Sequence, residues 1–269
     1  MQVSCDALVL NTADTKDSDK TLTLLCADRG RMRVTVKGGR TMNSALLPLC
    51  RPFLYANLEL YEKNGMYWLR GGMPVKYFSH ISESLDKLYC AAYFCEVATD
   101  ISGEGTPAKD LLRLLLNSLY ALDESLKDDR LVKAAFEWRA AYLEGYEPDL
   151  SGCGCCGKQR DEVMYLDVMA GTLCCPECMR KRGIGKENVL PDGTASIQSV
   201  LSGTVLEALR QIGSAGDRNF LSVPVRPEDL DDLGRVCETY LLNHLERGFD
   251  ALDAWKDMRK LVNYPPLRL

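Results

Sequence analysis

The sequence contains only two histidines, His80 and His244, and they lie far apart in the chain. It has no Walker phosphate-binding loop, no nucleophile elbow, no zinc-protease helix motif and no dinucleotide-binding fingerprint after its early apolar segments. No pair of carboxylates stands at a spacing that suggests acid–base catalysis. We therefore expect a protein that is not an enzyme.

The chain also lacks any apolar run of about 18 residues, the length at which a membrane-spanning helix is suspected. Residues 1–6 have no basic segment followed by an apolar stretch, so we expect no signal peptide. These absences predict a cytoplasmic protein without membrane contact. In that compartment the 12 cysteines are not expected to form a disulfide framework.

Charge is unevenly distributed along the chain. The net charge is -5, yet residues 1–80 hold 11 lysines and arginines against 7 acidic residues. A basic N-terminal part followed by an acidic body predicts one surface for a polyanion and another surface for a different partner.

Residues 1–75 have the pattern of short strands separated by turns. Residues 31–37 alternate, with apolar side chains on one face and Arg31, Arg33 and Lys37 on the other. Asn64-Gly65 between two apolar segments predicts a hairpin. The five expected strands are residues 3–12, 21–26, 31–37, 53–61 and 66–70. Five short strands fit a small barrel of the OB type, and an SH3-like barrel fits the pattern nearly as well.

From about residue 82 the apolar period becomes helical. The expected helical segments are residues 85–97, 108–122, 130–146, 197–212 and 227–245. After residue 250 the pattern is mixed, and Pro265-Pro266 argues against a terminal helix. The fold class is thus α+β: an N-terminal OB-fold barrel, then an all-α helical domain with an inserted four-cysteine zinc ribbon. The expected domains are residues 1–80, 81–150, 151–186, 187–249 and a C-terminal tail, 250–269.

Six of the cysteines gather between residues 153 and 178. Two C-x2-C pairs separated by 18 residues match a structural zinc site with four thiolate ligands and no open position. The predicted ligands are Cys153, Cys156, Cys175 and Cys178. Cys155 or Cys174 can replace a neighbouring ligand, and redox use of a C-x2-C pair is the rival interpretation.

No acidic residue occurs between Asp28 and Glu59. Basic side chains along this strand and the glycine turn after it suit a phosphodiester backbone. The predicted DNA-binding residues are Arg29, Arg31, Arg33, Lys37 and Arg40. The candidate stacking platforms for bases are Tyr55, Tyr61, Tyr67 and Trp68. A solvated basic face and aromatic core packing are the alternatives left open by the pattern.

The order of these parts resembles the RecO family of DNA-repair mediators. The resemblance spans nearly the whole chain and lies in the residues 21–25, 30–31, 36–40, 145–150 leading into Cys153, and 226–227 with the helix to Leu245. This chain departs from the family in its extra Cys155 and Cys174 and in having fewer basic residues after Lys37.

The resemblance implies a protein that binds single- and double-stranded DNA and anneals complementary strands. It implies action with RecR, and often RecF, in loading RecA onto DNA coated by single-strand-binding protein (SSB). It further implies that the helical domain recognises the acidic, apolar C-terminal tail of SSB, and that the protein is associated with the nucleoid. A zinc-ribbon adaptor without its own DNA site is the main alternative, and an enzyme using the cysteine cluster is a weaker one.

Overall fold

The computed structural model describes residues 1–15, 18–182, 196–216 and 219–262. The chain forms two compact units, which we call the first and the second unit. The first comprises Met1–Leu126 with Phe249–Leu269, and the second comprises Lys127–Gly248. The five predicted domains do not follow this division, because the first unit's boundary at Leu126 lies inside the predicted segment 81–150, and their boundaries stay a prediction. The boundary predicted at residue 186 and Pro265-Pro266 lie outside the described residues.

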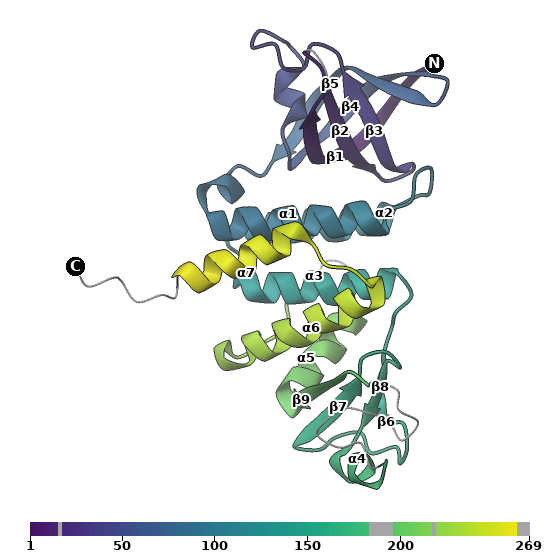
Figure 1. The fold of residues 1–269 in the computed structure, drawn as a ribbon, viewed down its shortest axis with the longest axis vertical. Coiled ribbons are helices and arrows are strands. Elements are labelled where there is room, and N and C mark those ends of the chain that lie inside the picture. The colour runs from purple at the N-terminus through teal and green to yellow at the C-terminus, as the bar shows by residue number, and fades with distance from the viewer. Residues whose placement is uncertain (16–17, 183–195, 217–218, 263–269) are drawn as a thin grey trace, which may run out of the picture. The chain divides into compact units, whose positions relative to one another are not determined.

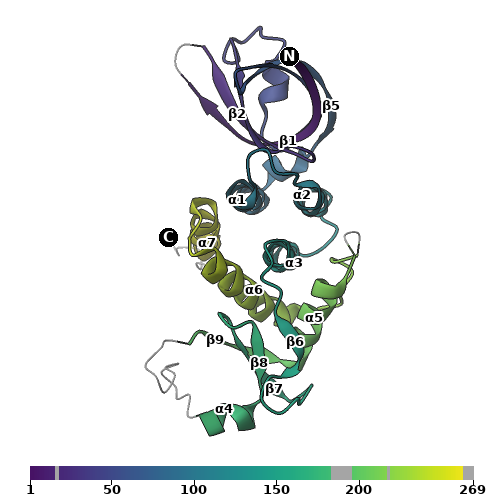
Figure 2. The ribbon, with the colours of Figure 1, turned by 90° about the vertical axis from the view of Figure 1, so that its right-hand side faces the viewer.

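A closed barrel forms the N-terminal part of the first unit, and Figure 2 shows it nearly end-on. Its strands follow the order β1-β2-β3-β5-β4 around the ring. Neighbouring strands are antiparallel except β3 and β5, which run parallel and close the barrel. This arrangement confirms the OB-type barrel. The strands are β1 (Gln2–Asp14), β2 (Lys20–Cys26), β3 (Gly30–Val36), β4 (Leu54–Lys63) and β5 (Met66–Tyr77).

The barrel forms because its strands alternate apolar and polar side chains. On β3 the apolar Met32, Val34 and Val36 are buried, while Arg33 between them is exposed. The same alternation on the other strands fills the interior with apolar side chains. The predicted hairpin between β4 and β5 is confirmed, because Asn64 and Gly65 both have positive φ, as a tight turn there requires.

Helices complete the first unit (Figure 1). They are α1 (Leu85–Ile101), α2 (Lys109–Asp123) and α7 (Asp250–Val262), with short 3₁₀ turns η1 (Leu47–Cys50) and η2 (His80–Glu83). The prediction of a tail without a helix from residue 250 is wrong for residues 250–262, because they form α7, which packs on α1. The Tyr93 and Phe249 rings lie 5.6 Å apart, and the Ala251 N–H donates to Glu96 at 3.0 Å. Ala251, Leu252, Trp255 and Met258 recur at helical spacing, a signal that the prediction of a tail overlooked.

The turn between β2 and β3 is fastened to the loop between α1 and α2. The Arg31 N–H donates to the Gly103 carbonyl at 3.0 Å, and the Gly105 N–H donates to Arg29 at 3.0 Å. Gly30 has φ +63°, and a Cβ there would collide with the Gly103 and Thr106 carbonyls. A glycine is therefore required where the chain is held this closely.

The second unit combines three long helices with a small sheet of order β6-β8-β7-β9 (Figure 1). The helices are α3 (Asp129–Leu143), α5 (Gly203–Ser214) and α6 (Leu230–Leu245), with the 3₁₀ turn η3 (Pro227–Asp229) and the short α4 (Pro176–Arg182). The strands are β6 (Asp149–Cys153), β7 (Val163–Asp167), β8 (Thr172–Cys174) and β9 (Gln198–Ser202).

The prediction of a helix over residues 197–212 is wrong for its first residues, because the helix α5 begins only at Gly203. Residues 198–202 form β9, which pairs antiparallel with β7. The helix begins only at Gly203, where the Ser202 hydroxyl accepts a hydrogen bond from the Val205 N–H. The pairing partner lies more than thirty residues earlier, so the apolar pattern alone does not distinguish strand from helix here.

A buried ion cluster joins α3 and α6. The Lys133 ammonium lies 2.6 Å from Glu137 and 2.9 Å from Glu238. The side chains of Lys133 and Glu137 are only 3% and 0% exposed, so the cluster depends on mutual charge compensation rather than on water.

Candidate metal centre and nucleic-acid interface

Three elements of the second unit bring four cysteines together. Strand β6 ends at Cys153, and a tight turn with Gly157 at φ +73° places Cys156 beside it. Strand β8 leads directly to Cys175, and helix α4 carries Cys178 one turn later. Pro176 begins α4, a position where its missing N–H costs nothing. Strand β7 lies between the two cysteine pairs in the sequence.

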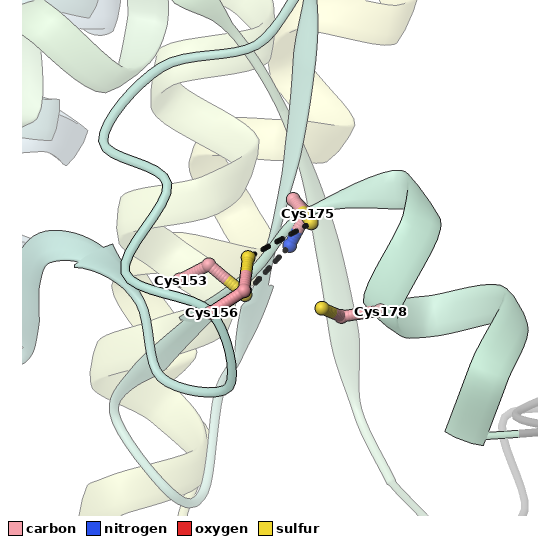
Figure 3. A group of neighbouring side chains, drawn as sticks. All are labelled: Cys153, Cys156, Cys175 and Cys178. Carbon is pink, nitrogen blue, oxygen red and sulfur yellow. Dashed lines mark hydrogen bonds between the residues drawn. The ribbon is translucent and has the colours of Figure 1, made fainter.

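The four sulfurs face a common centre (Figure 3). All four Sγ atoms lie within 4.8 Å of one another, and those of Cys156 and Cys175 are 3.7 Å apart. Cys153, Cys175 and Cys178 are buried, while Cys156 is exposed. The four predicted ligands are therefore positioned to bind a metal ion, and four thiolates suit a tetrahedral zinc ion.

The backbone and the neighbouring thiols determine how these cysteines ionise. Burial opposes ionisation of Cys153, but the N–H groups of Cys175, Cys155 and Cys156 point at its sulfur and lower its pKa to about 5. The Cys175 N–H lies 3.3 Å from that sulfur. Hydrogen bonds with Cys156 and Cys175 raise the pKa of Cys178. Four neighbouring thiols cannot all lose their protons unless a cation compensates the charge.

The two other cysteines of the cluster, Cys155 and Cys174, also group with Cys153. The sulfurs of Cys153, Cys155 and Cys174 lie within 4.8 Å of one another and form a second group. Cys155 is exposed and Cys174 is buried. Burial raises the pKa of the Cys174 thiol to about 12. The two groups of sulfurs share only Cys153.

The five predicted DNA-binding residues do not form one row. Arg33 and Lys37 are exposed on and just after β3. Arg31 turns to α1, where its guanidinium donates to the Thr99 carbonyl at 2.6 Å and lies 3.9 Å from Glu104. Arg40 lies 3.4 Å from Asp14 on β1. Strand alternation correctly predicts that Arg31 and Arg33 lie on the outer face of β3, but it does not reveal the partners of Arg31 and Arg40.

Two cavities of the first unit are lined by four of these five residues, and Arg40 lines neither of the two. The first, which we call the arginine cavity, has a volume of about 590 Å³. Its lining includes Arg29, Arg31 and Arg33, together with Tyr67, Asp28 and Glu104. The two carboxylates reduce its positive charge, so this cavity is a weaker anion site than its three arginines alone suggest.

The second cavity, which we call the aromatic cavity, lies between the end of β3 and the β4–β5 hairpin. It also measures about 590 Å³. It is lined by Lys37, Lys63 and Arg70, by Tyr61 and Trp68, and by Leu46, Asn64, Met66 and Leu69. No carboxylate is among these lining residues. Its walls thus combine three cations with two aromatic rings.

The rings of the aromatic cavity are arranged as an open platform. The Tyr61 and Trp68 ring centroids are 6.1 Å apart and tilted by 41°. The Arg70 guanidinium lies 5.2 Å from the centre of the Tyr61 ring. Sequence reasoning missed Lys63 and Arg70. In the predicted hairpin, Tyr61 pairs with Trp68 and Lys63 pairs with Met66. This pairing places Lys63 close to the two rings, so it was the signal that could have identified Lys63.

Comparisons with known proteins agree with this architecture. The model of the family "Recombination protein O N terminal" matches residues 1–78, and "Recombination protein O C terminal" matches residues 82–253. A "DNA repair protein RecO" of Acetivibrio thermocellus is 27% identical over 94% of this chain and 96% of its own length. That of Alkaliphilus metalliredigens is 25% identical over 95% of this chain and 99% of its own length.

A similar protein of Shouchella clausii, also named "DNA repair protein RecO", is 29% identical over 65% of this chain and 68% of its own length. Within the part of the chain that the structure describes, no helix is long and apolar enough to cross a membrane.

Proposed function

Because the chain belongs to the RecO family of DNA repair proteins, we propose that it is a recombination mediator that binds single- and double-stranded DNA and anneals complementary strands. In this proposal it acts with RecR, and often RecF, to load RecA onto DNA coated by SSB. It has no enzymatic activity of its own, and it works in the cytoplasm at the nucleoid.

The aromatic cavity is the observation that carries DNA binding. Three cations without a lining carboxylate attract the phosphodiester backbone, and two partly accessible rings offer surfaces on which unpaired bases stack. Strands 2 and 3 and the loop between strands 4 and 5 are also where OB folds bind oligonucleotides. Arg33 and Lys37 extend the site along β3, and Arg29, Arg31 and Arg40 remain proposed contacts at its edges.

The cysteine cluster is proposed to hold one structural zinc ion per chain. Thiolate donors from Cys153, Cys156, Cys175 and Cys178 fit this ion, and the N–H groups around Cys153 stabilise a negative sulfur. Zinc bound in this way would stabilise the fold of the ribbon and would take no part in a reaction.

The domains are proposed to divide the work. Residues 1–80 bind DNA, and the helical residues 81–150 and 187–249 recognise the acidic, apolar SSB tail. The ribbon, 151–186, and the C-terminal residues 250–269 complete the scaffold. Binding of a fluorescent peptide with the SSB tail sequence tests the second assignment.

The first experiment measures annealing of two complementary oligonucleotides at low and high salt, with and without SSB. Annealing that weakens with salt and persists on coated strands supports the proposal. Absence of DNA binding and annealing in every condition, with zinc present, would favour the zinc-ribbon adaptor instead.

Variants then test the cavity. Lys37→Glu should weaken binding to all sequences and reduce the salt slope by about one, as expected for one lost phosphate contact. Trp68→Ala should cost about 1–3 kcal/mol for each base that stacks there. Lys109→Glu makes the same charge change on α2, outside both cavities, and should leave binding nearly unchanged.

A further inference from the structure

Two cysteines that the proposed zinc site does not use, Cys155 and Cys174, lie beside it in the sequence. Cys155 sits inside the first C-x2-C pair, and Cys174 immediately precedes Cys175 at the end of β8. Successive side chains of an extended chain point to opposite sides. Cys174 and Cys175 therefore serve different groups: Cys175 belongs to the four-sulfur set, and Cys174 joins Cys155 and Cys153 in the three-sulfur set.

We propose that Cys153, Cys155 and Cys174 form a second metal site, for a soft monovalent cation such as Cu(I), with the Cys153 sulfur shared between the two ions. Three thiolates within 4.8 Å of one another are the donors that Cu(I) prefers. Structural zinc takes four protein ligands, so a site with three is better suited to copper than to a second zinc ion. The proposal rests on the proposed zinc site only through Cys153.

Burial and access support the same site. Cys174 is 4% exposed, which shields a bound ion from water and oxidants on one side. Cys155 is exposed and gives the ion a route of entry. The ion enters as Cu(I) and stays Cu(I). The thiols of Cys155 and Cys174 each release one proton to solvent, while Cys153 is already a thiolate in the zinc site.

These positions argue against a reserve role in zinc binding. Cys155 and Cys174 meet each other and Cys153, whereas the remaining zinc ligands Cys156, Cys175 and Cys178 belong to the other group. An ion at the centre of the four-sulfur group is thus closer to its own four sulfurs than to those of Cys155 and Cys174.

The experiment adds Cu(I), buffered by bicinchoninate and kept free of oxygen, to the full-length protein loaded with one zinc per chain. Copper and zinc contents are measured after gel filtration, and X-ray absorption at the copper edge reports its ligands. We expect one copper per chain with zinc retained, three sulfur ligands, and a zinc neighbour at short distance. Copper that displaces the zinc, or no retained copper, would overturn the proposal, and so would uptake of a second zinc with no copper.

Two variants identify the ligands. Cys155→Ser changes an exposed side chain and should lower Cu(I) affinity by more than about 100-fold, beyond what losing a mere outer-shell partner costs. Cys174→Ser should do the same, and both variants should keep their zinc. Cys50→Ser removes a buried thiol from the barrel and should retain both ions.

These outcomes separate the second site from the first. If the wild-type protein binds no zinc, the four-cysteine proposal fails by itself. If it binds zinc and Cys155→Ser retains copper unchanged, only the second site is wrong.

Discussion

The barrel and the ribbon are both small sheets, but they are stabilised in different ways. The barrel strands span 7 to 13 residues and enclose an apolar interior that includes Leu22, Leu24 and Leu58. The strands of the sheet that contains the ribbon, β6-β8-β7-β9, span 3 to 5 residues and bury few large side chains of their own, among them Leu166 and Leu201. A closed sheet supplies its own core, whereas the open sheet depends on packing helices and, in the proposal above, on one bound metal ion.

Replacing one of the proposed zinc ligands should reveal the difference between the two sheets most clearly. We expect Cys178→Ser to lose zinc and to expose β7 and β8, because metal binding contributes about 10–16 kcal/mol in small zinc modules and is coupled to their folding. Hydrogen exchange checks this strand by strand, with metal content measured in parallel. Strands β1 to β5 should keep their protection; their simultaneous loss would contradict the comparison. Loss of soluble protein is expected at higher temperature, so a chelator titration of the wild-type protein serves as the second measurement.

The buried ion cluster gives the second unit another dependence that the barrel interior lacks. Lys133→Met should destabilise the second unit by about 3–5 kcal/mol, because Glu137 would keep a buried charge without its ammonium partner. Urea unfolding measures the loss. The double variant Lys133→Met with Glu137→Leu should recover most of it. If the double variant is as unstable as the single one, packing rather than charge explains the effect.

A substitution that creates a cavity in the barrel should destabilise the barrel and leave the sheet of the second unit unchanged. Leu58 is fully buried, so Leu58→Ala should cost about 3 kcal/mol and loosen β1, β4 and β5. Zinc content and exchange in β7 should not change. A variant that also releases zinc would show that the two sheets do not fold independently.

A surface carboxylate should matter least. Asp14 accepts a hydrogen bond from Lys20 at 2.7 Å, which, with the nearby Arg40 charge, lowers the pKa of Asp14 below its usual value near 3.8. The carboxylate therefore stabilises the barrel above that pH, and its contribution is lost as the pH falls through the lowered pKa. Asp14→Asn should cause a smaller loss than the three changes above at about pH 7, and a still smaller loss at about pH 3, below the usual pKa of this carboxyl group. Unfolding curves at the two pH values check the sign; an equal loss at both would exclude the charge as its cause.

Local patterns predicted the parts whose causes are local. Alternation along residues 31–37 identified β3 and its basic outer face, and the C-x2-C spacing identified the four clustered cysteines. The sequence could not reveal that Arg31 reaches the Thr99 carbonyl, 68 residues away, or that residues 198–202 pair with β7. Those features depend on contacts between distant segments, where tertiary structure overrides the local period.

The aromatic cavity shows the same limit. Each ring was recognisable as a candidate platform, but Tyr67 packs against the barrel core while Tyr61 and Trp68 line the cavity. These roles follow from strand register, which pairs Tyr61 with Trp68 and Val34 with Tyr67. A one-residue shift in register would exchange the roles, so composition alone could not assign them.

Helix α7 has a consequence for the order in which the newly made protein assembles. It belongs to the first unit, yet the ribosome adds it only after the whole second unit has been synthesised. Until then the face of α1 around Tyr93 lacks the cover that Phe249 provides. The barrel can therefore close during synthesis, whereas the apolar face of α1 stays exposed until α7 has been made. In that interval this face is a binding site for chaperones and a site of premature association.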